Sequence, residues 1–183
     1  MKKSITKSLL VMFVMVLVFA SFALAVSAAE HTVAVASSDF LTRQGETFTT
    51  TIYIPDNANI VDFDITLNYD TDIITLVEAE EHEDVKGTVV FNAEQPGVIA
   101  INYTRTSKNV TSYLPIINLT FTVDENVGIG SYDCLTVDKN ATYIAHTLNS
   151  SGTLDPVDFT CDFANLELQE ARKAATGAGA GLA

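Results

Sequence analysis

The sequence contains no tryptophan, only two cysteines and few basic residues, with 10 Lys and Arg against 23 Asp and Glu over 183 residues. An acidic surface repels phosphate backbones, so we exclude nucleic acid as a partner. Carbohydrate-binding modules usually stack sugar rings on planar aromatic side chains, so the lack of Trp weakens that class. No Gly-x-Ser-x-Gly or His-Glu-x-x-His motif is present, and no residue set supports an enzyme.

Long apolar runs are confined to the N-terminus. Three lysines lie within residues 1–7, an apolar run covers residues 9–20, and small residues follow as far as Ala28-Ala29. This order predicts a secretory signal peptide over residues 1–28; an uncleaved membrane anchor is the alternative. We expect cleavage, an extracellular or cell-surface location and no stable membrane insertion afterwards. The mature chain would carry seven basic against 23 acidic residues, a net charge of about −16.

The two cysteines, Cys134 and Cys161, both lie in the part that would be secreted. An even pair in an oxidising compartment could form one disulfide, and two buried free thiols are the alternative. No Cys/His cluster has metal-ligand spacing, and each of the three scattered histidines is expected at the surface. We therefore predict no metal and no cofactor.

Alternation with a period of two dominates the chain after residue 30 and predicts about ten short strands. Many short strands separated by turn residues favour an all-β, two-sheet sandwich or a barrel. No internal repeat is visible, which predicts one domain over residues 30–166. Residues 165–175 look helical, and the glycine-rich end makes residues 167–183 a predicted flexible tail or linker.

The clearest alternation lies between Ile60 and Asp70. One set of side chains must form the core, and we expect Leu119, Phe121 and Val123 of a later strand to join it. The other set is polar and would form an outer face. The core set is Val61, Phe63, Ile65, Leu67 and Tyr69; the polar set is Asp62, Asp64, Thr66 and Asn68.

Two aspartates two residues apart on a strand have several interpretations. They could be a catalytic carboxylate pair, a calcium site, part of a partner-binding surface or an ordinary solvated strand face. One strand face supplies too few oxygens for calcium, and catalytic pairs usually come from different elements. The residues alone favour the solvated face, followed by a partner-binding surface.

The segment NIVDFDITLNYDTDIITLV, residues 59–77, resembles the signature of cohesin domains: an alternating strand, then Tyr-Asp, a short break and an apolar strand. Residues 45–52, 116–123 and 128–132 resemble earlier and later strands and a turn of the same family. The resemblance covers about 130 residues, from Thr32 to Phe163, and its specificity comes from the order and spacing of these motifs.

The resemblance implies a jelly-roll sandwich of about nine strands that binds a dockerin module through a flat sheet face, for extracellular or cell-surface assembly that could serve polysaccharide degradation. Asp62 and Asp64 fall at the family's contact positions, and any calcium belongs to the partner. Matching alternation leads us to expect Thr66, Asn68, Asn118 and Thr120 on the same face. Two departures from the family are Thr71 in place of proline and a basic loop over residues 105–112. The alternative function is direct polysaccharide binding.

Overall fold

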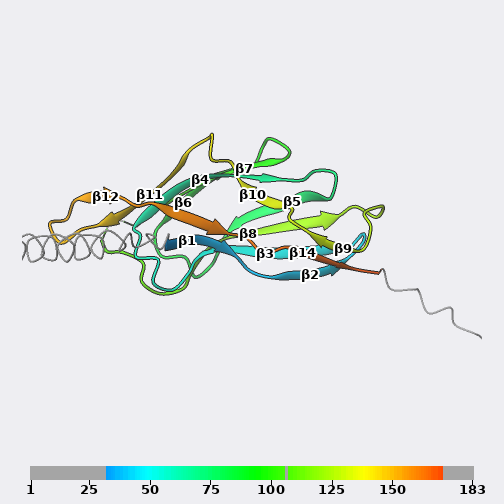
Figure 1. Ribbon diagram of the computed structural model, residues 1–183, viewed down its shortest axis with the longest axis horizontal. Coiled ribbons are helices and arrows are strands. Elements are labelled where there is room, and N and C mark those ends of the chain that lie inside the picture. The colour runs from blue at the N-terminus through cyan, green and yellow to red at the C-terminus, as the bar shows by residue number, and fades with distance from the viewer. Residues whose placement is uncertain (1–31, 106, 171–183) are drawn as a thin grey trace, which may run out of the picture. The chain divides into compact units, whose positions relative to one another are not determined.

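The computed structural model describes residues 32–105 and 107–170 (Figure 1). The predicted signal peptide and residues 171–183 of the predicted tail lie outside these residues. Within the described ranges no helix is long and apolar enough to cross a membrane. Fourteen strands occur there: β1 Thr32–Ser37, β2 Phe40–Arg43, β3 Thr47–Ile54, β4 Asp62–Tyr69, β5 Ile74–Glu81, β6 Thr88–Asn92, β7 Val98–Thr104, β8 Leu114–Val123, β9 Gly130–Tyr132, β10 Leu135–Val137, β11 Tyr143–Leu148, β12 Leu154–Pro156, β13 Phe159–Asp162 and β14 Leu166–Gln169.

The strands form three sheets. Sheet I has the order β13-β1-β3-β8-β5, and sheet II has the order β12-β11-β4-β7-β6, with β10 also paired to β4. Sheet III is small and has the order β2-β14-β9. Most neighbours are antiparallel, but β1 pairs parallel with β13 and β2 pairs parallel with β14. Late strands therefore lie beside early ones, as a jelly-roll sandwich requires.

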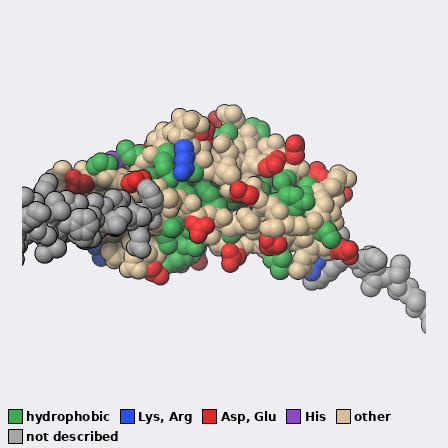
Figure 2. All heavy atoms as spheres, in the orientation of Figure 1, with side chains coloured by type: hydrophobic (Ala, Val, Ile, Leu, Met, Phe, Trp, Pro, Cys, Tyr) green, Lys and Arg blue, Asp and Glu red, His purple; other side chains and the backbone are tan. Residues whose placement is uncertain are grey.

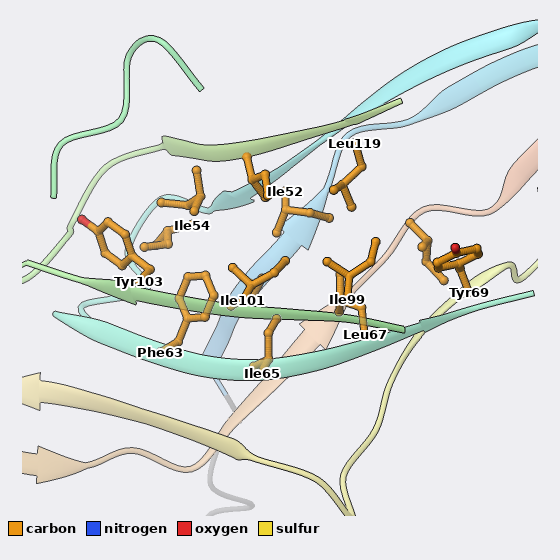
Figure 3. Close-up of a cluster of buried hydrophobic side chains, with 14 of the residues drawn as sticks. Ile52, Ile54, Phe63, Ile65, Leu67, Tyr69, Ile99, Ile101, Tyr103 and Leu119 are labelled. Carbon is orange, nitrogen blue, oxygen red and sulfur yellow. The ribbon is translucent and has the colours of Figure 1, made fainter. Parts of the chain in front are cut away.

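Sheets I and II enclose the core. In β4 every second side chain is buried, and the same alternation occurs in β7 and in the second half of β8. Figure 3 shows side chains from both sheets meeting between the layers. Ring contacts also cross the sandwich, from Tyr69 to Phe121 at 5.4 Å and from Tyr143 to Phe159 at 4.3 Å. These contacts pack the two layers against each other.

The structure confirms the all-β sandwich class and the core predicted from alternation. Residues Val61, Phe63, Ile65, Leu67, Tyr69, Leu119, Phe121 and Val123 are all less than a tenth exposed. The expected number of about nine strands is too low, because β2 and β12 are short enough to be missed in the sequence. In addition, two expected strands, over residues 132–137 and 157–166, are each broken into shorter ones.

The helical interpretation of residues 165–175 is wrong for residues 166–169. These residues form β14, which pairs with β2 on one side and β9 on the other. Leu166 and Leu168 are buried while Glu167 and Gln169 are exposed, so this short segment has the period of a strand. The folded domain therefore includes residues beyond position 166.

Candidate functional site: the outer face of sheet II

Four neighbouring strands, β11, β4, β7 and β6, build the outer face of sheet II. Because alternate side chains point to opposite faces, burial of the odd-numbered β4 residues turns the even-numbered ones outward. Strand register then arranges the outward side chains in rows across the sheet. The first row is His146, Asp62, Thr104 and Thr88, and the second row is Ile144, Asp64, Asn102 and Val90.

The second row combines polar and apolar side chains. In the strand register, Asp64 lies opposite Asn102 of β7 on one side and opposite Ile144 of β11 on the other. Asn102 in turn lies opposite Val90 of β6. Ile144 and Val90 are large apolar side chains that are 41% and 62% exposed. The row therefore places a carboxylate and an amide, which can form hydrogen bonds, between two exposed apolar side chains that a partner could cover.

The two aspartates have different surroundings. Asp62 Oδ1 lies 2.7 Å from Nδ1 of His146, and both side chains are at most a quarter exposed. Among the described residues, no side chain forms a hydrogen bond or an ion pair with the carboxylate of Asp64. The Asp62 carboxylate is thus engaged by His146 of β11, whereas the carboxylate oxygens of Asp64 can still accept hydrogen bonds from a partner. Sequence reasoning missed the role of His146, since only the pairing of β11 with β4 brings it to Asp62.

The six residues predicted to share one binding face do not do so. Thr66 and Asn68 lie with the two aspartates on β4 of sheet II, but Asn118 and Thr120 lie on β8 of sheet I. The prediction was wrong because β4 and β8 have the same alternation, and alternation says which side faces the core but not which sheet a strand joins. Asn118 and Thr120 belong to the outer face of sheet I, on the opposite side of the sandwich.

On that opposite face, polar side chains bond to one another across β3 and β8. Thr51 Oγ1 donates to Asn118 Oδ1 at 2.8 Å, and Thr49 and Thr120 hydroxyls lie 2.9 Å apart. A third pair, Thr47 and Thr122, has its hydroxyls 3.4 Å apart. These ladders use much of the hydrogen-bonding capacity that a partner would otherwise engage.

The basic loop that follows β7 is anchored beside the site through Asn109. Its Nδ2 donates to Thr147 Oγ1 at 2.9 Å and to the Leu148 carbonyl at 3.0 Å, while its Oδ1 accepts from the Leu148 amide at 2.6 Å. Asn109 therefore joins this loop to the end of β11. The sequence offers no signal for this contact, which depends on two segments 39 residues apart.

Both cysteines are free thiols, so the possible disulfide is absent from the structure. Burial raises the pKa of the Cys134 thiol to about 12. Burial also raises the pKa of Cys161 to about 12, although a hydrogen bond with Tyr143 opposes the shift. Cys134 follows β9, whereas Cys161 lies on β13 beside Tyr143 of β11. Both thiols are protonated at neutral pH and therefore poor nucleophiles.

No His, Cys, Asp and Glu cluster suited to a metal ion occurs within the described part of the chain.

Comparison with known proteins assigns the family. The family model for the cohesin domain matches residues 32–154, about two thirds of the sequence. The chain therefore belongs to the cohesin family, whose members are non-catalytic binding modules. No curated protein matches it.

Solved cohesin structures share the fold at low sequence identity. The seventh ScaB type I cohesin from Pseudobacteroides cellulosolvens is 19% identical, with a TM-score of 0.60 over 78% of this chain and 94% of that one. The sixth scaffoldin B cohesin from Acetivibrio cellulolyticus, solved in complex with a mutant Cel5 dockerin, is 14% identical, with a TM-score of 0.59 over 74% and 97% of the two chains. A non-cellulosomal cohesin from Archaeoglobus fulgidus is 10% identical, with a TM-score of 0.54 over 76% and 91%.

Proposed function

We propose that the outer face of sheet II docks a dockerin module, and that the chain is a non-catalytic binding module for assembly outside the cell. The observation that carries the proposal is the carboxylate of Asp64, which no side chain of the described residues engages and which lies in one row with exposed Ile144 and Val90. Dockerin complexes of cohesins with the same fold support this choice of partner. Asp64 would accept hydrogen bonds from Ser or Thr hydroxyls, or from Lys or Arg, of the partner.

The rest of the face suits a helical partner because its side chains are short. None of the outward residues of β4, β7, β11 and β6 is Lys, Arg or Glu, the long side chains common on solvated sheets. Such a face is flat and loses little side-chain entropy on binding. The outward residues are Asp62, Asp64, Thr66, Asn68, Val98, Ala100, Asn102, Thr104, Ile144, His146, Leu148, Thr88, Val90 and Asn92.

The test is calorimetric titration with dockerin modules encoded in the same genome, with calcium present because the dockerin would hold that ion. We expect the double change Asp62→Ala/Asp64→Ala to weaken binding by about tenfold or more, since buried charged contacts at an interface cost a few kcal/mol when truncated. The matched control is Thr49→Ala/Thr120→Ala on the other face, which should bind as the unaltered chain does. Equal affinity of both double variants would refute the proposal.

Direct polysaccharide binding remains the alternative function, and the geometry of this face disfavours it. Its outward side chains include no aromatic ring on which a sugar could stack, because Tyr69 and Tyr103 point into the core. Tyr53 and exposed Tyr113 do lie together, with ring centroids 4.8 Å apart, on sheet I and in the segment before β8. A panel of soluble polysaccharides in the same calorimeter separates the two functions, since tight sugar binding without dockerin binding would favour the alternative.

Secretion is part of the proposal and rests on the order of basic, apolar and small residues in positions 1–29. The acidic surface fits it, because such a surface keeps an extracellular protein soluble. Figure 2 shows red Asp and Glu side chains spread over the visible face, with few blue Lys and Arg. Mass spectrometry of the protein from culture medium should give an N-terminus near Ala29. An intact N-terminus in the membrane fraction would contradict secretion.

A further inference from the structure

The edges of the two large sheets differ in how they are protected. An unpaired edge strand exposes backbone N–H and C=O groups that another chain can pair with, and charges, proline or short length prevent this. At one edge of sheet I, β5 carries Glu78, Glu80 and Glu81, all exposed, and at the other edge β13 has four residues and ends at Asp162. At one edge of sheet II, β12 has three residues and ends at Pro156.

Strand β6, at the other edge of sheet II, has none of these protections. Its sequence is Thr-Val-Val-Phe-Asn, without charge, proline or glycine. All five residues pair with β7 on one side, and no strand of the described chain pairs with the other side. Val90, at its centre, is 62% exposed. This is the composition of a strand that pairs readily with another strand.

The N-terminal end of β6 is held firmly against β7. The hydroxyl of Tyr103 donates to the Lys86 carbonyl at 2.8 Å. A Cβ added to Gly87 would lie 2.7 Å from the Thr104 carbonyl oxygen and from the Tyr103 ring, so only glycine permits this close approach. The edge is therefore pre-formed, which lowers the entropy lost when a partner strand binds.

The charges at the two ends of β6 are opposite. Lys86 precedes the strand by two residues and lines hollows with Arg105 and Lys108. Glu94 follows the strand by two residues and lines a groove with Glu78. The ion pairs among the described residues are Arg43 with Glu46 and His146 with Asp62, so the three cations at the basic end have no acidic partner there.

Antiparallel pairing of β6 with itself satisfies all of these features. With a two-fold axis at Val90, Val90 faces its own copy, Val89 faces Phe91, and Thr88 faces Asn92. The same register sets Lys86 of each chain opposite Glu94 of the other. The sequence Lys-Gly-Thr-Val-Val-Phe-Asn-Ala-Glu over residues 86–94 is thus self-complementary in charge about its centre.

We propose that β6 is a homotypic docking strand, through which two copies of the chain join their second sheets edge to edge. The occupant is a second copy rather than an unrelated peptide because one register pairs the apolar centre with itself and both charged ends with their opposites. The contact uses the sheet edge, so it does not depend on the dockerin proposal. With five residues on each side, the interface is small, and the association is of the weak, reversible class.

The experiment is analytical ultracentrifugation of the chain without residues 1–28, from roughly 10 µM to 1 mM, where weak interfaces become populated. The unaltered chain should shift from monomer to dimer mass as its concentration rises. Lys86→Glu and Glu94→Lys should each weaken the dimer by about tenfold or more, because each sets like charges opposite each other twice. Glu80→Lys on β5, which changes net charge as Glu94→Lys does, is the matched control and should dimerise at least as well as the unaltered chain.

Mixing the two single variants gives the sharper result. Positions 86 and 94 are then both acidic in the Lys86→Glu chain and both basic in the Glu94→Lys chain, so a heterodimer should form where neither variant dimerises alone. The double variant Lys86→Glu/Glu94→Lys should also regain the dimer. A chain that stays monomeric at every concentration would overturn the proposal. So would a dimer that the single changes do not weaken, or single variants that fail to combine on mixing.

Discussion

The two outer faces of the sandwich are built from strands with the same alternation, yet their chemistry differs. On sheet I, Thr49 and Thr51 bond to Thr120 and Asn118 across the strands. On sheet II, Asp64 keeps its acceptor capacity and lies in a row with two exposed apolar side chains. A polar face whose groups are paired with one another stabilises its own sheet, whereas an unpaired carboxylate beside apolar groups is suited to a partner.

The largest expected difference is in stability, between a substitution on the inner side of β4 and one on its outer side. Phe63→Ala removes a ring that is 1% exposed and lies 5.7 Å from the Tyr103 ring, so it should lower the free energy of unfolding by about 3–5 kcal/mol. Asp64→Ala, one residue along the chain, should change it by about 0.5 kcal/mol or less. Urea denaturation of both variants measures the difference, and similar midpoints would contradict the assignment of the two sides.

Binding should discriminate the two faces and also the two aspartates. Asp64→Ala should weaken dockerin affinity by about tenfold or more, while Thr120→Ala should leave it within about twofold. Asp62→Ala should have a smaller effect than Asp64→Ala, since His146 already engages the Asp62 carboxylate. Calorimetric titrations of the three single variants test this order. An effect of Thr120→Ala as large as that of Asp64→Ala would show that the faces had been assigned the wrong way round.

A smaller effect concerns the threonine ladder on sheet I. Cross-strand polar pairs contribute roughly 0.2–1 kcal/mol, so Thr49→Ala and Thr120→Ala should each lower stability slightly. Because the two hydroxyls lie 2.9 Å apart, a double-mutant cycle should give a favourable coupling energy of that order. The same cycle for Asp64 and Thr120, which lie on different sheets, should give no coupling, and a measurable one would contradict the separation of the two faces.

The last and smallest expected effect concerns the reactivity of the two cysteine thiols, which belong to neither outer face. With pKa values of about 12, both thiols should react slowly with iodoacetamide at pH 8 in the folded protein and quickly in the unfolded one. Folding raises the pKa of each thiol, so the protonated thiols contribute to the stability of the folded state. That contribution is fully present below the unfolded pKa of about 8.5 and is lost as the pH rises toward 12. Rapid alkylation of the native protein at pH 8 would contradict the burial of the thiols.

Local alternation predicted the features that depend on one strand at a time. It assigned the inward and outward sides of β4 and the buried positions of β8 correctly, because a shift of one residue would bury two carboxylates. It could not assign β8 to a sheet, and so it placed Thr120 and Asn118 on the wrong face. Strand order depends on contacts distant in sequence, which a period of two does not encode.

The same limit explains why the details of the site were missed. The pairing of His146 with Asp62 joins residues 84 positions apart, and Asn109 reaches β11 from a loop 39 residues away. The strand after residue 165 was missed for a different reason. Leu-Glu-Leu-Gln is too short to distinguish a strand from the start of a helix, and only pairing with β2 and β9 decides it.

A nuclear magnetic resonance titration of the isotope-labelled domain with an unlabelled dockerin module tests most directly whether the outer face of sheet II docks the partner. We expect amide signals of β4, β7 and β11 to shift on binding, with the largest changes near Asp64, Asn102 and Ile144. Signals of Thr49 and Thr120 on sheet I should remain in place. Shifts confined to β3 and β8, with those of β4 unchanged, would contradict the assignment of sheet II as the docking face.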